Sequence, residues 1–569
     1  MIQANGKPTS GADIAGKRAI VIGGGLAGLA SAVEMAAHGL SVTLVEANHH
    51  LGGKMNLCSA EGFTFDMGPT IITLPQVFRG IVTRAGKDPA DYCELVDLDP
   101  QWRCHFEDGT VVDLRRDPEQ FAKAIDKQFP EQRPGDGYMR FIEWSRRMFR
   151  LSEKVFFYKD LGAATDMMFQ PPTDPGLLGD VMAMRMHSTV GATIDKFVKE
   201  RHIAQICEHF LQYVGSSPFL APAILGLIAS AQSDQGCWYP MGPKGSAPGG
   251  TRMIARSLAK LCGELGVEVI TGVSVEKITT DENARATGVV LGDGRQLAAD
   301  AVVSNCDVQR THRDLIEGPR AERERRSIAS KYRPACSGLV LYLGLNKRYD
   351  HLAHHNFLFS HNSHDEFADI YDRGIPAGDP TLYIAAPSAT DPGQAPEFGG
   401  EPGEALYVLI HTAYRRAGQR WEGEGGLLES YRPVVIEKMK RMGMPDLEER
   451  IVVERTLTPD GIERMYNAEG GAIYGLASHG KLAGGFKPRN RSRAFKGLYL
   501  TGGSSNPGPG VPMVLMSGVT AGRCVLEDFG IDPSNEGLSA AEPRELPAGS
   551  VRQAYHGPGA IPAAVHAAT

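Results

Sequence analysis

Three glycines near the start of the chain have the spacing that binds a dinucleotide. Gly23, Gly25 and Gly28 follow an apolar run and precede an Ala-rich stretch. The first permits a tight turn, the second lets a pyrophosphate approach the backbone, and the third lets helix and strand pack closely. Glu46 ends the next apolar run, where a carboxylate can bind ribose hydroxyls. The pattern predicts a βαβ unit that binds a dinucleotide at the helix N-terminus.

The histidine-rich segment 351–364 raises the alternative of a metal site. Its spacings match neither the helical HExxH pattern nor a regular histidine pair, so we interpret it as a loop and expect no bound metal. Spacing alone assigns no Ser-His-Asp or Cys-His set, and the catalytic residues stay unknown at this stage. The histidines concerned are His351, His354, His355, His361 and His364.

The overall composition argues against some partners and compartments. The chain of 569 residues has 60 basic and 67 acidic residues, a balance without the electrostatic footprint of nucleic-acid binding. Nine cysteines are scattered without CxxC pairs, which favours reduced, mostly buried thiols. The start of the chain lacks a secretory pattern, and no run reaches the roughly eighteen apolar residues of a membrane span. We therefore expect a cytoplasmic protein.

The elements that position the glycines are spread along the chain. A block at 251–278 combines a helical apolar face with two β-like runs, Asp293-Gly294 predicts a hairpin turn, and a β-like run at 497–500 leads into a Gly/Pro loop. We expect an α/β fold: a Rossmann-like nucleotide domain assembled from discontinuous segments, with an inserted α+β substrate domain. The expected boundaries are a flexible N-terminal tail at 1–16, nucleotide-binding segments at 17–80, 236–307 and 491–527, substrate-domain segments at 81–235 and 308–490, and a disordered C-terminal tail at 528–569.

The residues after Glu46 indicate which dinucleotide is bound. A turn that contains Gly53 and Lys54 is followed by a β pair that leads to Gly68. This arrangement is similar to FAD-binding members of the glutathione reductase and amine oxidase superfamily, in which such a turn lies beside pyrophosphate and flavin. We therefore expect FAD as the cofactor.

Five later blocks narrow the resemblance. In the same order, they resemble blocks of the bacterial-type phytoene desaturase family of carotenoid desaturases, and the likeness covers about residues 17–527. The blocks are "GCWYPMGPKGSAPGGTRMIARSLAKL", "VVSNCDVQRTHRDLI", "CSGLVLYLGLNKRYDHLAHHN", "ERTLTPDGIERMYNAEGGAIYG" and "GLYLTGGSSNPGPGVPMVLMSG".

The resemblance implies a cofactor site built from several segments. The family binds FAD noncovalently, and by position the Val275 backbone is expected to meet the adenine while the segment 507–512 lines the flavin. The residues so assigned to the cofactor are Gly23, Gly25, Gly28, Glu46, Gly53, Lys54, Gly68, Val275, Gly502, Gly503 and Val511.

The leading functional expectation is an FAD-dependent desaturase of a C40 or C30 carotenoid precursor, such as phytoene or dehydrosqualene. Two alternatives come from the same family: an enzyme that oxygenates a terminal methyl group, and an enzyme that isomerises the polyene. A non-catalytic prenyl-lipid carrier with the same fold, and an amine or porphyrinogen oxidase of the wider superfamily, are further alternatives. The intact glycines and Glu46 argue against the carrier. The late blocks argue against an amine or porphyrinogen oxidase.

An isoprenoid substrate has no polar handle, so we expect a long apolar tunnel. The apolar run 218–231 fits either a segment that dips into one membrane leaflet or a buried core helix. Basic residues at 487–496 could meet anionic headgroups or FAD phosphates, although a solvated loop is the favoured interpretation. We expect peripheral association with the inner face of the cell membrane. Because a second GxGxxG unit is missing, oxygen or a membrane quinone is the expected electron acceptor.

Asn506 departs from the family pattern, in which histidine or glutamine often precedes the Pro-Gly pair. Pro509 and Pro512 also make this loop unusually stiff. We expect the departure at Asn506 to bear on the choice of substrate.

Overall fold

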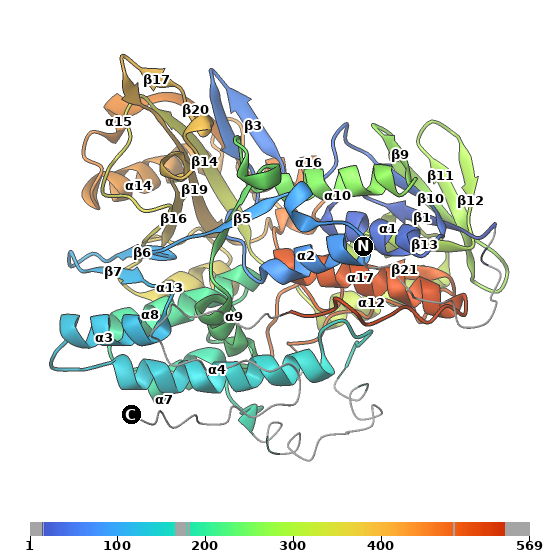
Figure 1. Cartoon of the computed structure of the whole chain (residues 1–569), viewed down its shortest axis with the longest axis horizontal. Coiled ribbons are helices and arrows are strands. Elements are labelled where there is room, and N and C mark those ends of the chain that lie inside the picture. The colour runs from blue at the N-terminus through green and yellow to red at the C-terminus, as the bar shows by residue number, and fades with distance from the viewer. Residues whose placement is uncertain are drawn as a thin grey trace.

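The computed structural model describes residues 14, 16–163, 166, 179, 183–481 and 484–540. A parallel sheet with its helices lies on the right of Figure 1, and a larger mixed sheet with a helical layer below it lies on the left.

The parallel sheet unites the three segments that the sequence assigns to the nucleotide domain. Every neighbouring pair of its strands is parallel, and β1 lies near its centre between β13 and β2. In spatial order the strands are β21 (Leu498–Leu500), β13 (Ala301–Ser304), β1 (Arg18–Ile22), β2 (Ser41–Glu46) and β9 (Glu268–Thr271). The α/β class with a Rossmann-like sheet assembled from discontinuous segments is confirmed.

Helices cover one face of this sheet and a small antiparallel sheet belongs to the other. The covering helices are α1 (Leu26–Ala37), α10 (Arg252–Glu264) and α17 (Val511–Asp528). Helices α1 and α17 approach closely, since a Cβ atom added at Gly518 would lie 2.3 Å from the Ala27 carbonyl oxygen. The small sheet contains β10 (Val275–Thr280), β11 (Ala286–Leu291) and β12 (Gln296–Ala298), and its β11–β12 pairing places the expected hairpin turn at Asp293-Gly294.

The mixed sheet joins strands from both insertions. Strand β14, which lies between β20 and β19, is buried on both faces, so alternate residues such as Leu341 and Tyr342 enter different cores. In spatial order its strands are β20 (Ile451–Leu457), β14 (Ser337–Leu345), β19 (Glu404–Thr412), β16 (Leu382–Ala385), β15 (His355–Leu358), β6 (Trp102–His105) and β7 (Val111–Leu114). Helix α14 (Leu427–Arg441) packs on one face.

A helical layer packs on the other face and contains the apolar run 218–231. The run is broken: it forms a short 3-10 helix at Ala223–Gly226 and the first part of α9 (Leu227–Gln235). Ala223, Ala229 and Ala231 are buried, so most of the run is core rather than an exposed leaflet-dipping segment. The layer's other helices are α3 (Pro118–Gln128), α4 (Gly135–Val155), α7 (Val190–Phe197) and α8 (Arg201–His209).

The remaining elements connect these layers. They are β3 (Leu57–Ala60), β4 (Phe63–Asp66), α2 (Pro75–Arg84), β5 (Glu94–Asp97), β8 (Trp238–Met241), α11 (Val308–Asp314), α12 (Pro319–Lys331), α13 (Ser363–Ala368), β17 (Glu397–Phe398), β18 (Glu401–Pro402), α15 (Leu447–Arg450) and α16 (Pro459–Tyr466).

The C-terminal segment continues beyond α17 and returns to the nucleotide domain. The Arg84 guanidinium donates to the carbonyl oxygens of Ser534 and Glu536, and the Gln76 Nε2 donates to that of Ala540. This part of the tail expected to be disordered is therefore bonded to α2, whereas residues 541–569 lie outside the described residues.

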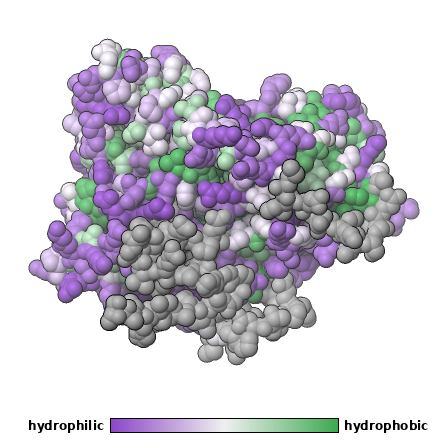
Figure 2. Space-filling model, viewed as in Figure 1, coloured by the Kyte–Doolittle hydropathy of each residue, from purple (hydrophilic) through white to green (hydrophobic). Residues whose placement is uncertain are grey.

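The surface is predominantly polar on the face shown in Figure 2, where hydrophobic residues form small separate patches. Within the described residues, no helix has the length and apolar character needed to cross a membrane.

Candidate functional site

The N-terminus of α1 has the backbone geometry that a dinucleotide cradle requires. Gly23 has φ +93°, and a Cβ atom at Gly28 would lie 2.0 Å from the Gly23 carbonyl oxygen, so both positions require glycine. Gly25 is the N-cap and offers no side-chain acceptor to the first helical amides. Those amides and the positive end of the helix dipole suit a diphosphate.

The Glu46 carboxylate is fixed at the end of β2. It accepts hydrogen bonds from the Gly24 amide at 2.7 Å and the Asn48 amide at 2.8 Å. The Val273 amide donates to the Glu46 carbonyl oxygen at 3.3 Å, and Val275 begins β10 two residues later. The candidate ribose and adenine positions are thus brought to one side of the cradle.

The turn that contains Gly53 packs directly on the cradle. A Cβ atom at Gly53 would lie 3.1 Å from the Gly25 Cα, and one at Gly68 would lie 2.0 Å from the Lys54 carbonyl oxygen. Burial lowers the pKa of Lys54 to about 8, although Asp307 opposes this shift. The Lys54 ammonium donates to the carbonyl oxygens of Ala472 and Ile473, which connects the cradle to the segment before Tyr474.

The Gly/Pro loop 502–510, which we call the arch, connects β21 to α17 beside this turn. Gly502 has φ +101°, and a Cβ atom there would lie 2.8 Å from the Asn305 Oδ1. The Asn305 Nδ2 donates to the Gly23 carbonyl oxygen at 3.2 Å. Asn305 therefore lies between the cradle and the arch. Val511 follows as the first residue of α17.

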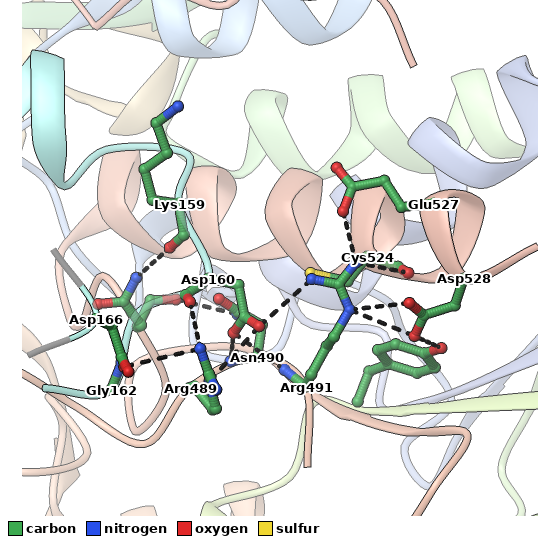
Figure 3. A network of polar contacts seen from close by, with 12 residues as sticks. Lys159, Asp160, Gly162, Asp166, Arg489, Asn490, Arg491, Cys524, Glu527 and Asp528 are labelled. Carbon is green, nitrogen blue, oxygen red and sulfur yellow. Dashed lines mark hydrogen bonds and ion pairs between the residues drawn. The ribbon is translucent and has the colours of Figure 1, made fainter. Parts of the chain in front are cut away.

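A network of hydrogen bonds and ion pairs holds the arch in place (Figure 3). The Asn490 Nδ2 donates to the carbonyl oxygens of Leu500 at 3.0 Å and Asn506 at 3.1 Å. The Asn490 amide in turn donates to the Asp160 carboxylate at 2.7 Å. The network thereby ties the arch to the segment that follows α4.

The basic side chains of 487–496 are largely engaged within the protein. Arg491 forms ion pairs with Glu527 and Asp528 at the end of α17, and Arg489 donates to the Asp160 carbonyl oxygen. Lys487 is 1% exposed. These contacts hold elements together, which differs from the expected solvated loop.

A cavity of about 690 Å³ extends from the arch to the mixed sheet and its helical layer. Its wall is mostly aliphatic and aromatic, and among the described residues that line it Lys481 is the only Lys, Arg, Asp or Glu. Burial lowers the pKa of His411 to about 4, and burial together with His411 lowers the pKa of His209 well below its usual value. Both rings are therefore neutral. Such a cavity suits a long apolar ligand.

The histidines of 351–364 serve other contacts. His354 Nδ1 bonds the Thr390 hydroxyl, and His355 Nδ1 bonds the Tyr383 hydroxyl. Within the part of the chain that the structure describes, no group of three or more His, Cys, Asp or Glu residues is placed to hold a metal ion.

The residues present fit a flavin dinucleotide. The uncapped start of α1 leaves backbone amides that can donate to a diphosphate, and the cradle leaves no room for a Cβ atom at Gly28. The Glu46 carboxylate at the end of β2 suits ribose hydroxyls.

Comparison with known proteins agrees with this fit. The family described as "Flavin containing amine oxidoreductase" matches residues 26–369, so the protein is an FAD-dependent oxidoreductase. The chain is 36% identical over 503 residues to 4,4'-diapolycopene oxygenase of Methylomonas sp, which covers 88% of this chain and 96% of that protein. It is also 36% identical over 502 residues to 4,4'-diaponeurosporene oxygenase of Staphylococcus haemolyticus, with 88% and 95% covered. The chain belongs to the flavin containing amine oxidoreductase family, in the carotenoid-enzyme group that the sequence motifs indicate.

Solved structures support the fold. An oxidoreductase from Methanosarcina mazei aligns with a TM-score of 0.56 and 16% identity, over 88% of this chain and 99% of that one. Cyclohexylamine oxidase from Brevibacterium oxydans aligns with a TM-score of 0.55 and 13% identity, over 90% and 99%. At this identity the likeness concerns the fold alone.

Sequence reasoning missed several residues that the structure brings to the site. Asn305 and Asn490 hold the cradle and the arch, whereas His209 and His411 line the cavity. Asn305 directly follows a parallel strand, a position that often faces a ligand, and this signal could have found it. The others lie in segments without a recognisable motif.

Proposed function

We propose that this flavoenzyme oxidises the terminal methyl group of a linear C30 carotenoid to an aldehyde. The named relatives support methyl oxygenation over the desaturation that the sequence placed first, because both are oxygenases of 4,4'-diapocarotenoids. The observation that carries the proposal is the charge-poor cavity that leads to the arch, since a hydrocarbon end group must reach the cofactor through an apolar passage.

The overall reaction balances with dioxygen as the oxidant. A methyl group and one O2 give an aldehyde and one water, so four electrons leave the carbon and four enter oxygen. Dioxygen is then also the electron acceptor, in place of a membrane quinone. When bound, FAD supplies the redox chemistry between carbon and oxygen.

The chain's own residues position both FAD and the carotenoid substrate. We assign FAD to the eleven residues taken from the sequence, of which Gly23, Gly25 and Gly28 form the phosphate cradle and Glu46 the ribose contact. The stiff arch holds the flavin side, and the apolar wall excludes water from the reacting carbon. Hydrophobic surroundings also orient a substrate that lacks polar groups.

The substrate would enter from a membrane surface. The mouth of the cavity includes Met186, which is 42% exposed, and a polyene is delivered most readily from lipid. We therefore retain peripheral association with the inner face of the cell membrane as part of the proposal. Co-sedimentation of the purified protein with anionic vesicles tests it, and Met186→Glu should weaken binding.

Product analysis separates oxygenation from desaturation. The enzyme is co-expressed with pathways that supply 4,4'-diapophytoene, 4,4'-diaponeurosporene or 4,4'-diapolycopene, and products are followed by chromatography and mass spectrometry. We expect aldehydes from the coloured polyenes and no new double bonds in the colourless precursor. New double bonds without oxygen incorporation would instead favour the desaturase alternative, and a change of geometry alone would favour the isomerase.

A further inference from the structure

His209, His411 and Tyr474 form a polar region of the cavity wall, which we call the polar end. His411 Nε2 and the Tyr474 hydroxyl lie 3.3 Å apart and share a hydrogen bond, and the two rings stack with centroids 6.0 Å apart. The His209 ring centroid lies 6.4 Å from that of His411. All three residues line the cavity, whereas most of its remaining wall is apolar.

His209 is unusual because it is buried without a polar partner. It is 5% exposed, and its ring meets Trp102, Phe357 and Phe359. Among the described residues, its nitrogens form no hydrogen bond. Burying an imidazole in this way is unfavourable unless something else satisfies it. Since His209 lines the cavity, a ligand group is the natural partner.

The polar end lies against the arch. A Cβ atom at Gly475 would lie 2.8 Å from the Gly503 carbonyl carbon, and one at Gly503 would lie 3.5 Å from the Tyr474 carbonyl oxygen. The polar groups are therefore close to the place where the reacting carbon must meet the cofactor. An unmodified methyl group cannot form a hydrogen bond with these polar groups, whereas a hydroxyl or aldehyde oxygen can.

We propose that the polar end recognises the oxygen of a partly or fully oxidised end group, with His209 as its main hydrogen-bonding partner. The inference rests on the proposed function and names a further substrate class, the terminal alcohol of the polyene. A neutral imidazole can donate to an aldehyde oxygen and either donate to or accept from a hydroxyl group. Recognition of the alcohol would hold it at the arch, so that one methyl group proceeds to the aldehyde before release.

Binding without turnover tests the proposal. The flavin-loaded enzyme is titrated under anaerobic conditions with detergent-solubilised 4,4'-diapolycopene, its terminal alcohol and its terminal aldehyde, and quenching of tryptophan fluorescence is followed. We expect the wild type to bind the alcohol and aldehyde about tenfold more tightly than the hydrocarbon, the contribution of one hydrogen bond. His209→Phe should abolish this preference with little change in hydrocarbon binding, and His209→Gln should restore most of it.

Two further variants keep the result interpretable. Tyr474→Phe removes a single hydroxyl and should reduce the preference several-fold even if His209→Phe fails to fold. His312→Phe is the matched control, because His312 is buried and bonds the Val308 carbonyl oxygen outside the cavity. An unchanged preference in Tyr474→Phe and in any folded His209→Phe protein would overturn the proposal.

The two proposals fail in different ways. If aerobic wild-type enzyme leaves the methyl group unoxidised but shows the preference that depends on His209, the proposed function is wrong and the recognition site stands. If it forms the aldehyde while His209→Phe keeps the wild-type preference and the same alcohol-to-aldehyde product ratio, the recognition site is wrong and the function stands.

Discussion

The side chain of Asn506 binds the backbone of Lys159, with its Nδ2 donating to the Lys159 carbonyl oxygen at 2.7 Å. This bond joins the arch to the segment that follows α4. Asn506 is fully buried and does not line the cavity. Its departure from the family pattern therefore concerns how the arch is held, whereas the sequence suggested a role in substrate choice.

Asn506→Ala should weaken flavin retention and leave polyene selection unchanged. Loss of the bond removes one of the two donors to the Lys159 carbonyl oxygen, which also accepts from the Leu161 amide at 3.1 Å. We expect it to lower the free energy of unfolding by about 0.5–1.5 kcal/mol. Urea unfolding, flavin release followed by fluorescence, and product profiles measure the three effects. Asn283→Ala, at an exposed turn, is the control and should stay within about 0.5 kcal/mol of wild type. A changed choice of polyene with normal flavin retention would contradict this account.

Gly28→Ala should abolish flavin binding. The added Cβ atom would meet the Gly23 carbonyl oxygen at 2.0 Å, so the turn that forms the phosphate cradle must shift. The ratio of flavin to protein absorbance in the purified variant measures the loss.

Gly263→Ala is the matched control for this substitution. Gly263 lies in α10 with no atom within 4 Å of an added Cβ, and alanine there should raise the free energy of unfolding by about 0.5–1 kcal/mol. Full flavin occupancy in Gly28→Ala would show that the cradle tolerates the methyl group. It would contradict the assignment of the FAD diphosphate to this cradle.

The sequence predicts those parts of the site that depend on local spacing. Gly23, Gly28 and Glu46 lie within one βαβ unit, so a short pattern specifies both their conformation and their neighbourhood. The Gly/Pro loop before α17 was recognisable for the same reason. The three-segment assembly was also expected, because helical and β-like runs of similar character recur at 251–278 and 497–500, far from the first βαβ unit.

The parts that the sequence does not reveal depend on contacts between distant segments. Asn490 meets Ser517 and Leu500 in the folded core, and Asn305 contacts Gly502, which follows the adjacent strand β21. The run 218–231 has an apolar composition that suits lipid or core equally, and its burial is decided by packing in the helical layer. His209 has no motif around it, because its significance lies in the lack of a partner.

Ending the chain after residue 530 should destabilise the protein, whereas ending it after residue 540 should not. The shorter chain loses acceptors for Arg84, which is also ion-paired with Glu34, and for Arg523. Hydrogen bonds to charged groups contribute about 1.5–3 kcal/mol each, and because water replaces some of the lost acceptors we expect a total loss of about 2–5 kcal/mol. Chemical unfolding of both truncated proteins measures the difference. Equal stability would mean that 531–540 contributes nothing to the fold.

Lys487 should make stability rise with pH above neutrality. Its ammonium donates to Ser478 Oγ at 2.7 Å and the Ala477 carbonyl oxygen at 3.0 Å, and burial lowers its pKa from 10.5 to about 7. Between these values the unfolded chain binds the proton and the folded chain releases it, so unfolding becomes less favourable as pH rises. Below about pH 7 both states are protonated and the folded state carries the full cost of burying the charge.

The difference in unfolding free energy between wild type and Lys487→Met isolates this effect from other alkaline titrations. Wild type should gain stability relative to the variant between about pH 7 and pH 10, by an amount on the order of a few kcal/mol. Lys196→Met, at an exposed helical position, is the matched control, and its profile should follow that of wild type. A difference between wild type and Lys487→Met that is constant over this range would show that Lys487 stays protonated in the folded protein, held by its oxygen acceptors despite burial.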